Sequence, residues 1–380
     1  GLWCFNRQYC CSGFCLLVAE NLQREDYFTP QRNPPGLTMI SSEPYSQNNR
    51  PSLYFRALSG HRANYVRILG CYFDHILEDR NLSVFNRLDR LIRPSRLVFG
   101  MIDDDYFHFF FISFIRLILM KETSGFFVRP QTCFRPNFLS IAKLVLFFLF
   151  SKLPKINIYS LLPHYCFPKM KFVCSDYIYD PELWHLSENH EVCSVAEIPS
   201  IAGLVVQKSP TILVCGLIAT HKGIKDLYDI LTAGNLIAGG WRVIVAGKSP
   251  DDSESLEVRR QLESIGCISV NRYITDTELD HLYGISDYIW CSYDLVYDQS
   301  SGIFGTAIQR SKVPIVRSGT MIAKFAKHLS IDTINMVIDA PIQNSQRLID
   351  AEYGKIFQRA QLDVGMWRCD FETKLDVRSM

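Results

Sequence analysis

The chain has 380 residues, of which 48% are hydrophobic and 21% are charged. This length fits two domains of ordinary size, and the apolar content is too high for a chain that is disordered throughout. Lysine and arginine total 40 residues, aspartate and glutamate total 39, and the net charge is +1. A dedicated nucleic-acid-binding protein carries a strong basic excess, so we expect no nucleic acid partner.

The cysteines and the N-terminus bear on the compartment. Thirteen cysteines are scattered along the chain, without the density or regular spacing of a disulfide-rich secreted domain. Cys4, Cys10, Cys11 and Cys15 lack the paired C-x2-C spacing of a zinc site, and we expect no bound metal. The N-terminus shows no secretory signal pattern. These features predict a cytoplasmic protein.

Strands and helices alternate in the first half of the chain, after an irregular N-terminal extension that we assign to residues 1–35. The breakers Asn33 to Gly36 precede a strand predicted at 37–41. A helix is predicted from the Ser59 and Gly60 pair to Leu69, and buried strands are predicted at 97–102 and 125–128. We therefore assign residues 36–202 to an acceptor-side Rossmann-like domain.

Residues 138–150, with the sequence FLSIAKLVLFFLF, form the most apolar stretch. Lys143 interrupts it, and it falls short of the ~20 apolar residues of a membrane span, so we expect it not to cross a bilayer. Basic residues flank the stretch, which leaves two interpretations open. It is either an interfacial helix on anionic lipid, which would attach the protein peripherally to the inner face of a membrane, or a buried helix against a parallel sheet.

The second half shows a clearer alternation of short apolar strands with helices. Strands are predicted at 211–216, 241–247, 267–270, 288–291 and 313–316. Such alternation predicts a doubly wound, nucleotide-binding α/β domain, to which we assign residues 203–344. An amphipathic helix is predicted from Ser345 to Gln361, and we expect the C-terminal segment 345–380 to pack back across both domains.

Two loops of the second domain suit an anion. The loop 216–223 lies where the first strand passes into the first helix, the position at which open α/β sheets bind phosphates, and Lys222 supplies a cation there. Ser300, Ser301 and Gly302 open a helix after the fourth strand, where backbone N–H groups attract an anion. The alternatives are structural: a turn with a solvated lysine, and capping of the helix by a serine.

From about Pro210 to His328 the sequence resembles the C-terminal domain of retaining GT-B glycosyltransferases (glycosyl transferases group 1, family 4-like). The resemblance rests on Gly216 and Lys222, which stand one residue closer together than in the family, and on Gly247 at the end of the second strand. It implies a GT-B-like α/β fold, in which two Rossmann-like doubly wound domains face each other across a cleft.

The resemblance also implies a function. A sugar would be moved from a nucleotide-activated donor to a glycan or lipid-linked acceptor, in polysaccharide or glycoconjugate synthesis. The nucleotide-diphosphate sugar is then a substrate, and no cofactor is implied. The residues that it assigns to donor binding are Gly216, Lys222, Gly247, Arg272, Glu278, Ser300, Ser301 and Gly302.

Further roles follow from the resemblance. Arg272 to Glu278 falls where the family places a loop near the nucleotide base, although Thr275 with Glu278 also fits a helix capping box. Asp298 would contact the transferred sugar. His61 would face the cleft and assist the acceptor hydroxyl, or it is a hydrogen-bonded loop residue; His108 is a second candidate of this kind.

The sequence departs from the family in two respects. Leu217 stands where the family has an arginine, which leaves one cation for the diphosphate. The family's paired glutamates align with Asp298 and Thr306, so the second acid is missing. It is also missing in the register one step along, at Gln299 and Ala307. These departures keep two other functions open: a catalytically silent scaffold that binds a nucleotide sugar or a partner enzyme, and a sugar-nucleotide epimerase.

Overall fold

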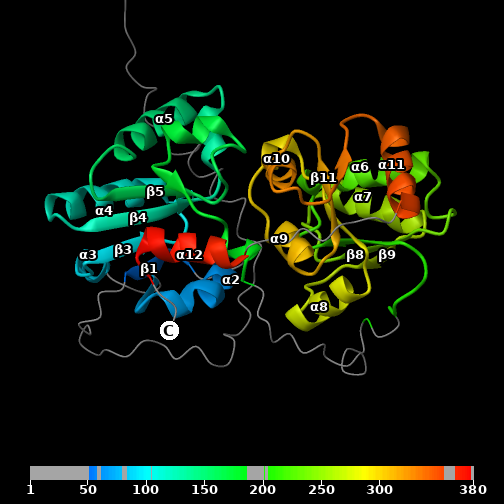
Figure 1. Ribbon diagram of the computed structural model, residues 1–380, viewed down its shortest axis with the longest axis horizontal. Helices are drawn as coiled ribbons and strands as arrows, with labels where there is room; N and C mark the ends of the chain where they lie inside the picture. Colours follow the sequence, from blue (N-terminus) through cyan, green and yellow to red (C-terminus); the bar gives the residue numbers. More distant parts are fainter. Residues whose placement is uncertain are drawn as a thin grey trace, which may run out of the picture. The chain divides into compact units, whose positions relative to one another are not determined.

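The computed structural model describes residues 51–57, 61–78, 84–103, 105–185, 201, 204–354 and 364–377. The N-terminal extension, the strand predicted at 37–41 and the domain boundary predicted at 202–203 lie outside these residues. The described chain contains two six-stranded sheets, and the strand pairs within them are parallel. Helices connect the strands, as parallel pairing requires (Figure 1).

The first sheet has the strand order β2-β1-β3-β4-β5-β6. Its strands are β1 (Ser52–Phe55), β2 (His75–Glu78), β3 (Arg96–Phe99), β4 (Glu122–Phe127), β5 (Ile156–Ser160) and β6 (Asp176–Tyr177). Its helices are α2 (His61–Leu69), α3 (Val84–Ile92), α4 (Tyr106–Ile118) and α5 (Phe138–Phe150), with the short 3-10 helices η1 (Gly70–Tyr72), η2 (Pro130–Phe134), η3 (Pro168–Phe172) and η4 (Pro181–Leu183).

The second sheet has the strand order β12-β11-β10-β7-β8-β9. Its strands are β7 (Thr211–Cys215), β8 (Arg242–Ala246), β9 (Ile268–Val270), β10 (Tyr288–Cys291), β11 (Val313–Arg317) and β12 (Ile334–Met336). Its helices are α6 (Ile224–Ala233), α7 (Ser253–Ser264), α8 (Asp276–Gly284), α9 (Gly302–Gln309), α10 (Met321–His328) and α11 (Pro341–Gly354), with η6 (Thr220–Lys222) and η7 (Leu295–Tyr297).

Most of the predicted elements are confirmed. All five strands predicted in the second half are present, while the three-residue strand β12 was not predicted. The strand expected at 97–102 is shorter, because β3 ends at Phe99. The helix expected to start at Ser345 begins four residues earlier, at Pro341, and the Ser345 hydroxyl donates to the Ile342 carbonyl at 2.8 Å instead of capping the helix.

Both faces of the second sheet are covered. Ile212 and Val214 share a buried cluster with residues of α6, α7 and α11, whereas Leu213 and Cys215 share another with residues of α8 and α9 (Figure 1). Successive side chains of a strand point to opposite faces, so the run of apolar residues in β7 is what a sheet with helices on both sides requires.

The centre of the second sheet positions the candidate site. β7 pairs with both β8 and β10, and the chain proceeds from β7 toward one edge of the sheet and from β10 toward the other. This is the strand order of the dinucleotide-binding fold, in which ligands bind where the direction of winding reverses, beyond the carboxyl ends of the strands. The loops after β7 and β10 therefore lie where a ligand is expected.

The helix α12 (Val364–Leu375) packs with elements of the first sheet (Figure 1). Its Trp367 and Phe371 are 1% and 0% exposed, and the Trp367 ring stacks on Tyr179 with 4.9 Å between centroids. The Arg96 guanidinium donates to the Leu375 carbonyl at 2.7 Å. The end of the chain is thus anchored by aromatic burial and by a hydrogen bond to β3.

We expect Trp367→Ala to lower the free energy of unfolding by about 3–5 kcal/mol, because it empties a buried aromatic site that cannot collapse completely. Urea denaturation followed by circular dichroism measures this. The control is Met366→Ala on the same helix, at a position 52% exposed, which we expect to stay within about 0.5 kcal/mol of the wild type. Equal effects of the two substitutions would show that α12 is not part of the core.

Candidate functional site

Two glycines bring the ends of β7 and β8 close together. Gly216 has a φ of +88° and Gly247 has a φ of +144°, a range that L side chains rarely adopt. A side chain at position 247 would also overlap the carbonyl oxygen of Gly216. Both glycines singled out in the sequence thus lie together at the carboxyl edge of the sheet, and Gly216 lies against Ile303 of α9.

Lys222 is buried among aromatic rings. Its side chain is attached at the end of η6, the residue is 8% exposed, and the Trp290 indole donates to its carbonyl at 2.9 Å. The ammonium lies 4.3 Å from the centroid of the Tyr293 ring and 5.3 Å from that of Tyr297. No carboxylate in the described part of the chain forms an ion pair with it. The alternative of a solvated lysine is therefore wrong, and burial lowers the pKa of Lys222.

The N-terminus of α9 lies next to this lysine's aromatic neighbours. Ser301 is the N-cap: its hydroxyl accepts from the Phe304 amide at 3.4 Å and lies 3.0 Å from the Tyr293 hydroxyl. Within the residues that the structure describes, the amide N–H groups of Gly302 and Ile303 have no hydrogen-bond partner. Ser301 thus acts as a cap, and the first turn still has donors for an anion.

Two carboxyl groups that the sequence did not reveal lie against the same helix. Ser300 donates to the Asp180 carboxylate, and Gly302 faces the carboxylate of Glu182. Burial, together with the charge of Glu182, raises the pKa of Asp180 to about 7, and burial raises the pKa of Glu182. No motif in the sequence marks Asp180 or Glu182, because a contact between residues 120 positions apart leaves no local pattern.

Three other sequence candidates have partners of their own. Arg272 and Glu278 form a two-point ion pair, at 2.9 Å through one guanidinium nitrogen and 2.6 Å through the other, and Glu278 completes the capping box with Thr275. The Asp298 carboxylate accepts from the Met321 amide at 2.8 and 3.0 Å. Burial raises the pKa of Asp298 to about 6.

The two histidine candidates belong to the first sheet. His61 is the first residue of α2, and its side chain is not among those described. His108 of α4 lies 3.2 Å from the Asp105 carboxylate and 3.3 Å from the Tyr54 hydroxyl. No group of three or more metal-ligating side chains occurs in the described ranges, and Cys4, Cys10, Cys11 and Cys15 lie outside them.

Comparison with known proteins identifies the fold. No family model and no curated protein matches the sequence. Among solved structures, HepE of Anabaena in complex with UDP and glucose is 10% identical with a TM-score of 0.60, over 86% of this chain and 99% of that chain. WaaG, a glycosyltransferase involved in lipopolysaccharide biosynthesis, is 11% identical with a TM-score of 0.51, over 86% and 95%.

A third similar structure is a UDP-forming α,α-trehalose-phosphate synthase from Burkholderia xenovorans. It is 12% identical with a TM-score of 0.50, over 77% of this chain and 76% of that chain. At such identities the likeness shows the fold. The chain has the GT-B fold, with two Rossmann-like α/β domains, and the predicted fold class is confirmed.

The raised pKa of Asp180 gives a testable pH dependence of stability. Its folded value of about 7 exceeds the ~3.9 of an unfolded aspartate, so the folded state takes up this proton first. Its contribution to stability is complete below about pH 4 and is lost as the pH rises through about 7. The free energy of unfolding of the wild type, minus that of Asp180→Asn, should therefore increase as the pH falls. Urea denaturation at several pH values tests this, and a constant difference would contradict the raised pKa.

Proposed function

We propose that the protein is a glycosyltransferase that moves a sugar from a nucleotide-diphosphate donor to an acceptor. The observation that carries the proposal is the Lys222 ammonium, which is buried without a carboxylate ion pair in the described chain. A buried cation is costly unless an anion accompanies it. The diphosphate of a donor supplies that anion, at the edge of the sheet where the fold binds ligands.

The chemistry asks for positive groups around the diphosphate. When the bond between the sugar and the diphosphate breaks, negative charge develops on the leaving oxygen, and fixed donors stabilise it. Lys222 and the free amides of Gly302 and Ile303 would supply these donors. Gly216 and Gly247 would allow the backbone to approach the donor closely. HepE has been solved in complex with UDP and glucose, which supports a donor of this class.

The remaining sequence assignments stay proposals. Asp298 would orient the transferred sugar, Arg272 with Glu278 would lie near the base, and His61 would assist the acceptor hydroxyl. On the resemblance of the sequence, we propose retention of the anomeric configuration. The acceptor would be a glycan or a lipid-linked saccharide in polysaccharide or glycoconjugate synthesis, in the cytoplasm.

A silent scaffold is the second candidate, and specific observations favour it. Leu217 replaces a cation at the edge of the site and is 40% exposed, and Glu182 already lies against the N-terminus of α9. A silent scaffold binds a nucleotide sugar without turnover. Release of UDP from a panel of donors and acceptors separates the two functions, and an epimerase would instead convert the donor without any acceptor.

We expect Lys222→Ala to weaken UDP binding by about 10-fold or more, because a charge-assisted contact to phosphate contributes roughly 1.5–3 kcal/mol. Isothermal titration calorimetry measures the dissociation constant. Lys225→Ala is the matched control, since Lys225 is an exposed lysine three residues further on whose ammonium pairs with Asp229 at 2.9 Å.

The control should bind UDP as the wild type does. If Lys222→Ala binds UDP with unchanged affinity, Lys222 is not part of a diphosphate site and the proposal loses its main support. Thermal melts of both variants establish that each is folded before binding is compared.

A surface of the first sheet's helices bears on localisation. The helices α4 and α5 pack together through Phe110, whose ring centroid lies 4.8 Å from that of Phe147 and 4.5 Å from that of Phe150. Phe147 is buried, whereas the opposite side of α5 is exposed. The exposed apolar residues of the two helices and of the turn after α4, which we call the α4–α5 face, are Phe107, Phe111, Phe114, Ile118, Leu119, Met120, Phe138, Leu139, Ile141, Val145, Phe148 and Leu149.

We propose that the α4–α5 face rests on the inner surface of a membrane that carries the acceptor. An exposed apolar patch of this kind marks an interaction site, and exposed basic residues nearby suit anionic lipid: Arg135, Lys152, Lys169 and Lys171. Of the two interpretations of residues 138–150, neither describes the whole helix, because α5 is half packed and half exposed. No helix among the described residues has the length and hydropathy of a membrane span.

We expect the wild type to float with liposomes of phosphatidylcholine and anionic phosphatidylglycerol at low salt. High salt should release much of it, because basic residues near anionic lipid contribute about 1 kcal/mol each and are screened. The double variant Phe111→Ser and Phe138→Ser should float less. The control pair Val206→Ser and Ile342→Ser, both 73% exposed, should float as the wild type does. A wild type that stays unbound at low salt would refute membrane attachment.

A further inference from the structure

The Glu182 carboxylate of η4 lies against the first turn of α9. A side chain at position 302 would overlap the Glu182 carboxylate, and one at position 305 would overlap the Glu182 main chain. Gly302 and Gly305 thus let η4 lie directly on the helix. Gln309, at the end of α9, donates to the Glu182 carbonyl at 2.9 Å. Two glycines and a glutamine of α9 therefore contact η4 directly.

The two acids of η4 are held differently. Asp180 accepts hydrogen bonds from Ser300, from the Tyr65 hydroxyl at 2.8 Å and from the Glu182 amide at 3.0 Å. The Glu182 carboxylate accepts a hydrogen bond from the Asn64 amide. These hydrogen bonds suit a structural role for Asp180. Glu182 accepts fewer hydrogen bonds, and its carboxylate is the one that faces the N-terminus of α9.

The surroundings of Glu182 belong to the proposed donor site. The N-terminus of a helix carries partial positive charge, which stabilises a carboxylate beside it. Lys222 and Arg67 lower the pKa of Glu182, against the burial that raises it. The Lys222 ammonium and the α9 amides are also the groups that would receive a diphosphate. Two anions in one such site repel each other, so a charged Glu182 opposes the binding of a diphosphate there.

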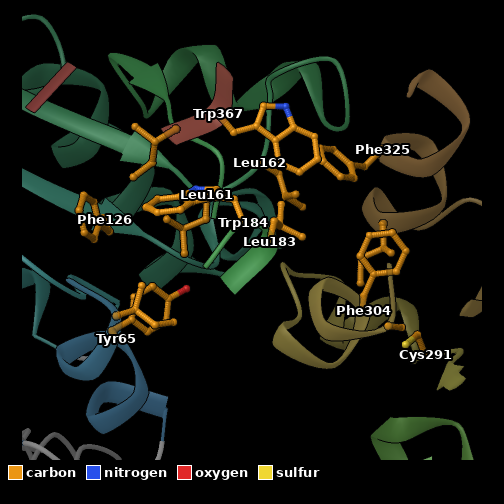
Figure 2. Close-up of a cluster of buried hydrophobic side chains, with 14 of the residues drawn as sticks. Tyr65, Phe126, Leu161, Leu162, Leu183, Trp184, Cys291, Phe304, Phe325 and Trp367 are labelled. Atoms are coloured by element: carbon orange, nitrogen blue, oxygen red, sulfur yellow. The ribbon is translucent and has the colours of Figure 1, made fainter. Parts of the chain in front are cut away.

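Hydrophobic contacts hold η4 in this position as well. Leu183 and Trp184 follow Glu182, are 1% and 6% exposed, and belong to the same buried cluster as Phe304 of α9 and Phe325 of α10 (Figure 2). The carboxylate is thus supported by a packed segment, and it is not a freely moving surface side chain.

We propose that Glu182 is an internal competitor of the donor: its carboxylate lies beside the α9 anion site and must be displaced before a nucleoside diphosphate binds the free amides. The proposal rests on the proposed function and adds a means of regulating that site. Displacement separates Glu182 from the first turn of α9 and breaks the contacts of Ser300 with Asp180 and of Gln309 with the Glu182 carbonyl. The free energy of these contacts is subtracted from that of donor binding.

The test compares UDP binding to the wild type and to Glu182→Gln by isothermal titration calorimetry, with GDP and ADP measured alongside. Glutamine keeps the volume and removes the charge. Because a charge at a helix N-terminus contributes up to about 2 kcal/mol, we expect Glu182→Gln to bind UDP about 3- to 30-fold more tightly. Glu263→Gln, an exposed glutamate of α7, is the control and should bind as the wild type does.

The outcomes separate the two claims. UDP binding that depends on Lys222 but is equal or weaker in Glu182→Gln overturns the competition and leaves the proposed function standing. If neither protein binds any of the three nucleotides, both the proposed function and the competition are overturned. A purely structural role of Glu182 predicts a lower thermal stability without tighter binding.

A second measurement uses the wild type alone, in case Glu182→Gln does not fold. The Leu183 amide donates to the Asp180 carbonyl at 2.8 Å and the Trp184 amide donates to the Pro181 carbonyl at 3.2 Å. Saturating UDP should speed the hydrogen exchange of these amides, because displacement loosens η4. Unchanged or slower exchange in the presence of bound UDP would overturn the proposal.

Discussion

The burial of the Lys222 ammonium is the constraint on which the account of the site depends. Desolvation of an ammonium costs several kcal/mol, whereas a cation–π contact of a desolvated cation contributes about 2 kcal/mol. The rings of Tyr293 and Tyr297 therefore offset only part of the penalty. A diphosphate against Lys222 would offset the rest, which is why a binding role explains this lysine better than a structural one.

The fold determines what surrounds that lysine. Because β7 and β10 are neighbours whose connections run in opposite directions, η6 and the N-terminus of α9 meet at the same edge of the sheet. Gly216 and Gly247 have no side chains, so the two backbone segments lie close together there. The same edge receives η4, so one region holds a cation, free helix amides and the chain's own carboxylates. These groups offer electrostatic stabilisation to an anionic ligand.

The sequence predicted the parts of this arrangement that are local. Buried parallel strands are continuous apolar runs, so β7, β8 and β10 were recognisable, and Gly216, Lys222 and Gly247 could be placed at strand ends. Tyr293 and Tyr297 could have been noticed, since both follow β10 and stand four residues apart. The contact of Glu182 with Gly302 could not, because it joins residues far apart in sequence, and such a contact leaves no periodicity or motif.

The polar residues selected from the sequence show the same limit: the sequence did not predict which groups their side chains contact. Arg272 and Glu278 fit both a base-binding loop and a capping box, and the structure shows them paired with each other. Asp298 was selected by alignment with a family acid, yet its carboxylate contacts the Met321 amide. A residue type at a motif position gives the chemistry that is available, and the direction of the side chain depends on neighbours that the motif does not contain.

A crystal structure of the protein soaked with UDP would show whether a diphosphate binds Lys222. We expect electron density for the diphosphate beside the Lys222 ammonium and the first turn of α9, with the Glu182 carboxylate displaced from Gly302. Density for UDP at any other place on the protein, with Lys222 still covered only by its aromatic neighbours, would contradict this expectation.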